Sequence, residues 1–201
     1  MPPHDEAARL TLLSVHPALF YRPGERLSLP ELTAARLDGH VIEVGEGYMP
    51  VDTVESSAAR AVSIAMLLPR RTAASGPTAA WVHGAGDLPP SIHHATRIGR
   101  ARLRTAPSAR VIYHDRPLAP EEVQLIGGIA VTTPRVTAET LLFAAARKGG
   151  DDRWLRALLQ VCPGLAEAAC ERITPADHRP GSQAAKRLLA EIMTDQEVVT
   201  R

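Results

Sequence analysis

The sequence predicts an α+β protein made of three consecutive parts. Within the first fifty residues a capped helix is followed by two short strands, which is the order of elements in a winged helix. Strand patterns then alternate with helix patterns, and the remaining residues show helical periodicity only. We therefore expect a degenerate winged-helix segment over residues 1–53, a small mixed α/β module over 54–148, and a helical tail over 149–201.

The N-terminal segment predicts two helices and a hairpin. The first helix is expected over residues 5–14. Ser28 is followed three residues later by Glu31, a capping-box pattern that predicts a second helix over residues 29–37. Two strands are expected around a glycine-containing turn, over residues 40–44 and 48–51.

The second helix of a winged helix enters the DNA major groove, where it presents basic or amide side chains to base edges. Here the helix over residues 29–37 offers Arg36, and the hairpin carries Glu43 and Glu46. Residues 1–60 hold five Arg and nine Asp or Glu, a net charge of −4 that opposes contact with phosphates. The alternative is that this helix and hairpin only cap the main domain.

The middle of the chain predicts three helices, a strand near His93 and three further strands. Ser56 or Ser57 caps a core helix that Pro69 ends, and Ser75 caps a small-residue helix that contains Trp81. Strands are expected over residues 110–114, 123–126 and 129–132, the last two joined by a Gly-Gly turn. The expected helices cover residues 54–68, 75–84 and 133–148, the last capped by Thr133 with Pro134 in its first turn.

The tail predicts three further helices. Trp154, Leu155, Leu158 and Leu159 form one apolar stripe at helical spacing. Pro163-Gly164 ends this helix. Two more helices are expected over residues 165–172 and 182–193, with frayed residues from 194 to 201.

Positive charge is concentrated in the middle of the chain. Residues 61–116 hold eight Arg and two Asp, a net charge of +6, although the whole chain has a net charge of +1. Such a segment predicts binding to an anion, either a phosphate backbone or an acidic protein surface. The alternative is a solvated surface without a partner. Six arginines lie between Ile92 and Arg116, namely Arg97, Arg100, Arg102, Arg104, Arg110 and Arg116.

Three motifs occur in the same order as in a known family. They are AAWVHG at 79–84, LPPSIH at 88–93 followed by an expected strand, and GGIAVTTPRVTAETLL at 127–142. The third is the most specific and is similar to the signature dGIpVTtParTllDla. With them the chain resembles the AbiEi-like antitoxins of type IV toxin–antitoxin systems over roughly residues 25–145.

The resemblance implies a function, and the sequence departs from the family at two places. Family members pair a winged helix with this α/β module, bind operator DNA, and repress an operon shared with a nucleotidyltransferase-like toxin. Here Glu46 replaces an expected arginine in GEGY at 45–48, and Phe143 replaces the aspartate of the signature.

We therefore expect a DNA-binding transcriptional regulator whose partners are operator DNA and a nucleotidyltransferase-like toxin. The alternative is an interaction module of the same fold that binds a partner protein and no DNA. The expected DNA-binding residues are Arg36, Arg97, Arg100, Arg102, Arg104 and Arg110.

Enzymatic, metal and cofactor sites are not expected. His93 and His94 are adjacent in an expected strand, so they point to opposite faces and cannot chelate one ion together. Gly84-Ala85-Gly86 lacks the preceding strand of a dinucleotide loop. Cys162 and Cys170 match no zinc spacing. No catalytic residues, metal ligands or small-molecule cofactor are therefore predicted.

A cytoplasmic location is expected. No run of eighteen apolar residues predicts a membrane span. The first six residues form neither the basic nor the apolar region of a signal peptide. Two cysteines in 201 residues do not form a disulfide framework, which favours a reducing compartment.

Overall fold

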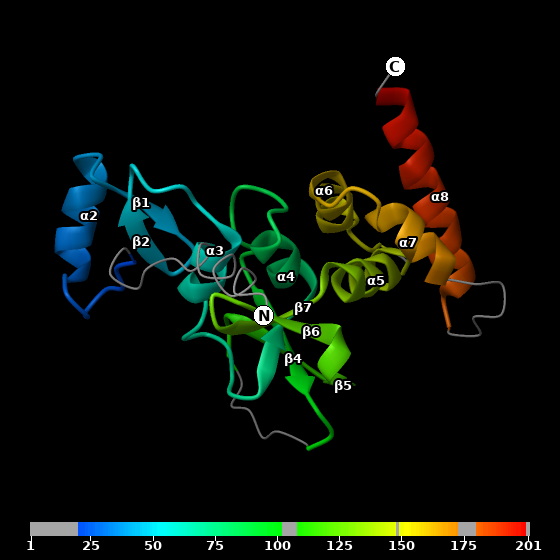
Figure 1. Cartoon of the computed structure of the whole chain (residues 1–201), viewed down its shortest axis with the longest axis horizontal. Helices are drawn as coiled ribbons and strands as arrows, with labels where there is room; N and C mark the ends of the chain where they lie inside the picture. Colours follow the sequence, from blue (N-terminus) through cyan, green and yellow to red (C-terminus); the bar gives the residue numbers. More distant parts are fainter. Residues whose placement is uncertain (1–19, 102–107, 148, 173–179, 200–201) are drawn as a thin grey trace, which may run out of the picture.

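The computed structural model describes residues 20–101, 108–147, 149–172 and 180–199, and it confirms a mixed α/β protein. Figure 1 shows an N-terminal helix and hairpin on one side, a sheet in the middle and helices on the other side. The expected helix over residues 5–14 lies outside the described residues. Within the described ranges, none of the helices combines the length and apolarity that crossing a bilayer requires.

The N-terminal part consists of α2 (Leu29–Leu37) and the antiparallel strands β1 (Val41–Val44) and β2 (Gly47–Pro50). The capping box is confirmed, because the backbone amide of Ser28 donates to Glu31 at 2.7 Å and the amide of Glu31 donates back to the Ser28 hydroxyl. Leu32 of α2 is fully buried against Val41 and Tyr48 of the hairpin. This small core fixes the helix on the hairpin.

The hairpin tip packs against the middle of the molecule. Gly45 has φ +56°, and a Cβ atom there would lie 2.1 Å from the Ser63 hydroxyl oxygen and 3.1 Å from the Trp81 ring. One apolar cluster joins the hairpin side chains to α3 (Ser57–Ser63) and α4 (Gly76–Val82). The core therefore runs across the expected boundary between residues 53 and 54.

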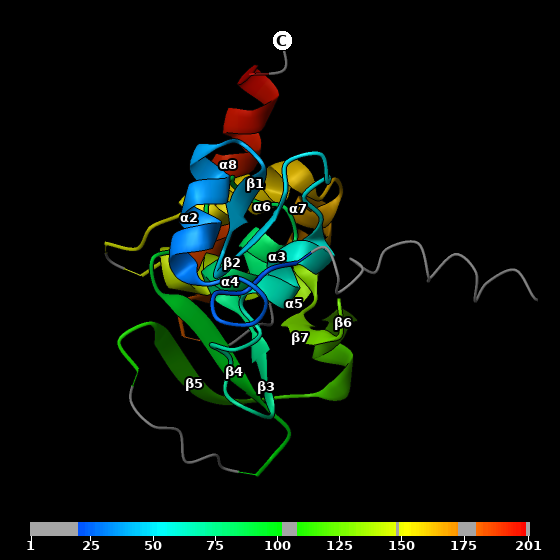
Figure 2. The same ribbon diagram turned by 90° about the vertical axis from the view of Figure 1, so that its left-hand side faces the viewer.

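The middle part is a five-stranded mixed sheet with the order β5-β4-β3-β7-β6. The β3–β7 and β4–β5 pairs are parallel, and the other two pairs are antiparallel. Its strands are β3 (Thr72–Ala74), β4 (His93–Ile98), β5 (Val111–Leu118), β6 (Val123–Ile126) and β7 (Ile129–Thr132). The expected pair 123–126 and 129–132 is confirmed with its Gly-Gly turn. Figure 2 shows β3, β4 and β5 side by side.

The central strand β3 was not predicted. It has only three residues, and all three are buried because the strand lies between β4 and β7 with cover on both faces. Ala73 packs against Leu118 and Val136 on one face, whereas Ala74 joins the Trp81 cluster on the other. Two alanines suit a strand that is crowded on both sides, but they carry no alternating pattern.

Helices cover both faces of the sheet and extend beyond it. α5 (Pro134–Ala145) covers the Ala73 face, and α3, α4 and the hairpin cover the Ala74 face. The tail helices pack on α4 and α5 through a second apolar cluster that includes Leu142, Leu158 and Leu189. These helices are α6 (Arg153–Val161), α7 (Leu165–Arg172) and α8 (Ser182–Val199).

Several expected boundaries were wrong. The helix expected over residues 54–68 is the shorter helix α3. The helix expected over residues 133–148 is α5, which ends at Ala145. The turn of helix expected over residues 118–123 is confirmed as the 3₁₀ helix η3 (Pro120–Glu122), which directly precedes β6. α8 continues past the expected end at residue 193 to Val199. Ser75 stands at the N-cap of α4 but makes no capping bond, because its hydroxyl accepts from Thr96 at 2.7 Å.

Candidate nucleic-acid interface

The predicted DNA-binding arginines do not form one surface. Arg36 is exposed in the last turn of α2. Figure 1 shows α2 on the far side of the hairpin from the sheet. Arg100 follows the end of β4, whereas Arg110 precedes the start of β5. Because β4 and β5 are parallel, these two residues lie at opposite ends of the sheet. Arg102 and Arg104 lie outside the described residues.

Arg97 is a buried structural residue, which corrects its expected role. Arg97 is only 6% exposed to solvent. The guanidinium donates to the backbone oxygens of Asp115, Gly99 and Arg100, at 2.7, 3.1 and 2.6 Å, and lies 2.9 Å from the Asp115 carboxylate. These bonds engage all three guanidinium nitrogens inside the protein, so Arg97 holds the start of the 99–110 connection and is not exposed to contact a phosphate.

Exposed arginines instead gather where β3 begins and β4 ends. Arg70 and Arg71 form the turn into β3, and the amide of Ile98 donates to the Arg71 carbonyl at 2.9 Å. Arg100 follows two residues after Ile98. We call Arg70, Arg71 and Arg100 the sheet-end arginines. All three are exposed, and none takes part in an ion pair among the described residues.

Arg70 and Arg71 are not among the DNA-binding residues expected from the sequence. The available signal was the pair of arginines directly after Pro69, where the preceding helix was expected to end. Arg71 has φ +62°, a left-handed conformation that costs an L-residue about 1–2 kcal/mol. The turn is held because the hydroxyl of Thr72 donates to the Pro69 carbonyl at 2.6 Å.

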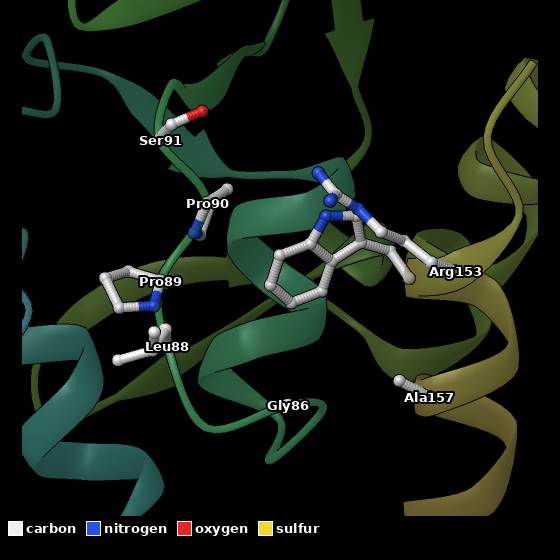
Figure 3. Close-up of a pocket in the computed structure, with 8 residues that line it drawn as sticks. Gly86, Leu88, Pro89, Pro90, Ser91, Arg153 and Ala157 are labelled. Atoms are coloured by element: carbon white, nitrogen blue, oxygen red, sulfur yellow. The ribbon is translucent and has the colours of Figure 1, made fainter.

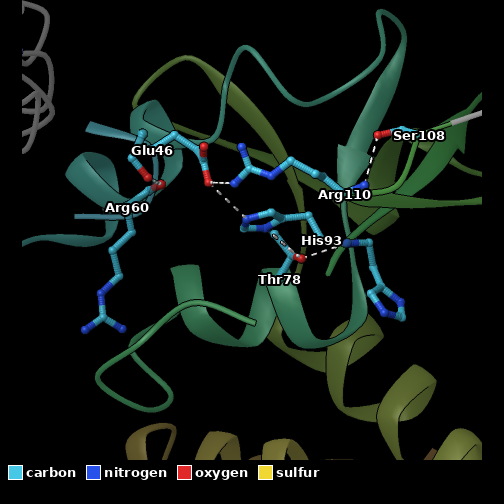
Figure 4. Close-up of polar contacts among 8 residues, drawn as sticks. Glu46, Arg60, Thr78, His93, Ser108 and Arg110 are labelled. Carbon is cyan, nitrogen blue, oxygen red and sulfur yellow. Dashed lines mark hydrogen bonds and ion pairs between the residues drawn. The ribbon is translucent and has the colours of Figure 1, made fainter. Parts of the chain in front are cut away.

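Arg110 is tied to the hairpin tip. Its guanidinium pairs with the Glu46 carboxylate, which also lies 3.9 Å from His93 Nε2 (Figure 4). The hydrogen bond that Arg110 donates to Glu46 raises the pKa of Arg110 above its ordinary value. Burial lowers the pKa of His93, and the positive charge of Arg110 lowers it further against the opposing effect of Glu46. The tip is therefore anchored to the sheet and does not project as a free wing.

A groove lies between α5 and the sheet, on the face of the sheet that α5 covers. His94 of β4 and His114 of β5 share this face, and His94 Nδ1 lies 3.0 Å from His114 Nε2. Burial, followed by the positive charge that neighbouring His114 can carry, lowers the pKa of His94 to about 4. Burial also lowers the pKa of His114. Both rings are therefore neutral at pH 7.

A second cavity, of about 430 Å³, lies beside this groove. Figure 3 shows Leu88, Pro89 and Pro90 on one wall and Arg153 on the opposite wall. Trp154 of α6 also lines it and continues into the groove. Its lining is mostly apolar. Among the described residues, no group of three His, Cys, Asp or Glu side chains is placed to hold a metal ion.

No protein-family model matches this sequence, and no curated protein matches it. The resemblance to the AbiEi-like antitoxins therefore stays a prediction based on the three motifs. The first motif contains two structural residues: Trp81 is buried in the core, and His83 Nε2 donates at 2.7 Å to the carbonyl of Thr132 in the third motif.

Proposed function

We propose that this protein is a DNA-binding transcriptional regulator of the antitoxin type. The observation that carries the proposal is the group of sheet-end arginines, which places three exposed positive charges at one end of the sheet. Arginine suits this role because its planar guanidinium donates two parallel hydrogen bonds to a phosphate. The resemblance to AbiEi-like antitoxins adds operator DNA and a nucleotidyltransferase-like toxin as the partners.

Phosphate contacts give affinity and base contacts give specificity. The sheet-end arginines supply the first kind of contact. The resemblance adds α2 as the recognition helix of a reduced winged helix, with Arg36 as its one basic side chain. Because Arg36 lies apart from the sheet, the phosphate contact rests on the sheet-end arginines alone. Arg110 contributes little, because Glu46 already neutralises it.

A gel-shift titration with the DNA upstream of the protein's own reading frame tests the proposal. We expect binding that weakens with salt, because each phosphate contact adds about 0.9 to the slope of log K against log salt. Arg70→Ala/Arg100→Ala should lower that slope by about 1.8. The matched control is Arg135→Ala/Arg187→Ala, which removes the same charge from exposed positions on α5 and α8.

Two outcomes would contradict the proposal. No binding by the unmodified protein at low salt rejects DNA binding altogether. Equal slopes for Arg70→Ala/Arg100→Ala and for its control remove the sheet-end arginines from the interface.

A second candidate function is binding to a partner protein without DNA. Exposed apolar side chains in and directly after the N-terminal part favour this function: Leu37 is 75% exposed and Val54 is 84% exposed. The anchored hairpin tip also argues against use as a wing. Co-purification with the product of the adjacent reading frame, after nuclease treatment, tests this function. Leu37→Asp should weaken that complex, whereas Leu125→Asp on β6, also exposed, should not.

A further inference from the structure

The two histidines of the groove come from neighbouring strands. His94 pairs in register with Ile112, and Thr96 pairs with His114, so the histidines are diagonal neighbours on one face. Their ring centroids are 5.2 Å apart and the ring planes differ by 30°. This cross-strand pair differs from the adjacent pair His93 and His94, whose side chains point to opposite faces.

The distance between the two facing nitrogens suits a shared ion. Metal–nitrogen bonds to histidine are about 2.0–2.1 Å long. With His94 Nδ1 and His114 Nε2 3.0 Å apart, an ion bound to both would subtend an angle of about 90–97°. That angle matches neighbouring positions of a square-planar or octahedral ion better than the wider angle of a tetrahedral one.

We propose that His94 and His114 bind a divalent transition-metal ion of the Ni²⁺ and Cu²⁺ class. Binding requires both facing nitrogens to present lone pairs, so the proton between them must move to the outer nitrogen of the ring that carries it. Water, or a ligand with oxygen donors, would fill the remaining coordination positions. This site is independent of the proposed DNA contact, which lies at the end of the sheet.

The surroundings of the pair leave room for those ligands. Both histidines line a cavity of about 350 Å³, and Ser91 and Asp151 line it too. Asp151 pairs with Arg153 at 2.8 Å, so its carboxylate is held at the cavity by a residue of α6. Imidazole is a preferred ligand for Ni²⁺ and Cu²⁺, and the two neutral rings avoid the charge repulsion that would keep a cation away.

Isothermal titration of the tag-free, metal-free full chain with Ni²⁺ at pH 7.5 tests the site. We expect one dominant ion per chain, together with a Ni²⁺-dependent rise in the melting temperature. His94→Gln and His114→Gln should each weaken binding by about tenfold or more, since losing even an outer partner of a metal ligand costs that much. The same variants should lose the rise in melting temperature.

His40→Gln is the matched control, because His40 is exposed before β1 and far from the groove in sequence. It should bind Ni²⁺ as the unmodified chain does. Circular dichroism without metal verifies that each variant is folded, and a variant that is not folded is replaced by the corresponding Asn. The proposal is overturned if the unmodified chain binds no Ni²⁺ at millimolar concentration, or if His114→Gln binds it equally well. Either result would leave the pair as a hydrogen bond between strands.

Discussion

At the scale of single residues, the position of a charge matters more than its presence in a basic segment. Arg97 and Arg100 are three residues apart in an arginine-rich stretch. One is enclosed by backbone carbonyls and the other is exposed. Arg97 lies within β4, on the same face as buried His93 and Ala95, whereas Arg100 lies beyond the end of the strand.

Replacing Arg97 by Met should destabilise the fold strongly. The substitution removes charged hydrogen bonds and leaves the carbonyls of Gly99, Arg100 and Asp115 without this donor. We expect a loss of about 2–4 kcal/mol in the free energy of unfolding, measured by urea denaturation. Asp115→Asn is the comparison and should cost about 0–1 kcal/mol, because that carboxylate is half exposed. Equal losses for the two variants would contradict the bridging role of Arg97.

Protonation of His83 should lower the free energy of unfolding in mild acid. Burial lowers its pKa, although the bond to the Thr132 carbonyl raises it in part. The unfolded chain therefore binds a proton more readily, so this contribution is full above pH 6.5 and is lost as pH falls through the lowered pKa. Urea denaturation between pH 7.5 and 5 should show the decline, with a smaller slope for His83→Gln. An unchanged slope in that variant would contradict the assignment to His83.

At the scale of elements, the hairpin is joined to the sheet at its tip. The Gly45-Glu46 turn contacts Ser63 and Trp81 through the glycine and Arg110 through the glutamate. α3 follows the hairpin in sequence, whereas Arg110 is 64 residues away from Glu46. Local and distant contacts thus meet at one turn.

Gly45→Ala should test how closely that turn is packed. The added Cβ atom requires both a left-handed alanine and a shift of the Ser63 side chain. We expect a cost of about 2–4 kcal/mol in the free energy of unfolding. Gly39→Ala has a similar φ of +76° but nothing within 4 Å, and it should cost only about 1 kcal/mol. The measurement is again urea denaturation, and equal costs would show that the tip is loosely packed.

At the scale of the whole molecule, one core joins the N-terminal part to the α/β module. Met49 of β2 and Trp81 of α4 are both buried in the cluster that also contains Phe20 and Ile64. Large apolar side chains from both sides of residue 53 are therefore needed to exclude water from it.

Removing residues 1–53 should prevent normal packing of the remaining chain. Losing Phe20, Val44 and Met49 leaves Trp81 without its cover, and each such loss costs about 2–5 kcal/mol against a typical total of about 5–15. The full chain should unfold in one transition by near- and far-ultraviolet circular dichroism. The fragment over residues 54–201, made with Trp154→Phe so that its signal comes from Trp81, should lack the near-ultraviolet tryptophan signal that the full chain with Trp154→Phe shows. A fragment that keeps this signal would show two independent folding units.

Local chemistry explains which elements were predictable. The capping box at Ser28, the Gly127-Gly128 turn and the Thr133-Pro134 helix start each specify structure within a few residues, and all three are confirmed. The short strand β3, the occupied hydroxyl of Ser75 and the His94–His114 pair each depend on residues about 20 or more positions away. A single sequence without those distances could not place them.

The three-residue strand β3 has a consequence for how the native protein opens. It is the only link in the described sheet between the β5-β4 half and the β7-β6 half. Amide protons at Ala73 and Ala74 should therefore exchange with solvent only when the whole sheet comes apart. The edge strand β5, with most of its residues exposed, should exchange through smaller local openings. In hydrogen-exchange terms, the least conspicuous strand in the sequence should be among the slowest segments of the chain.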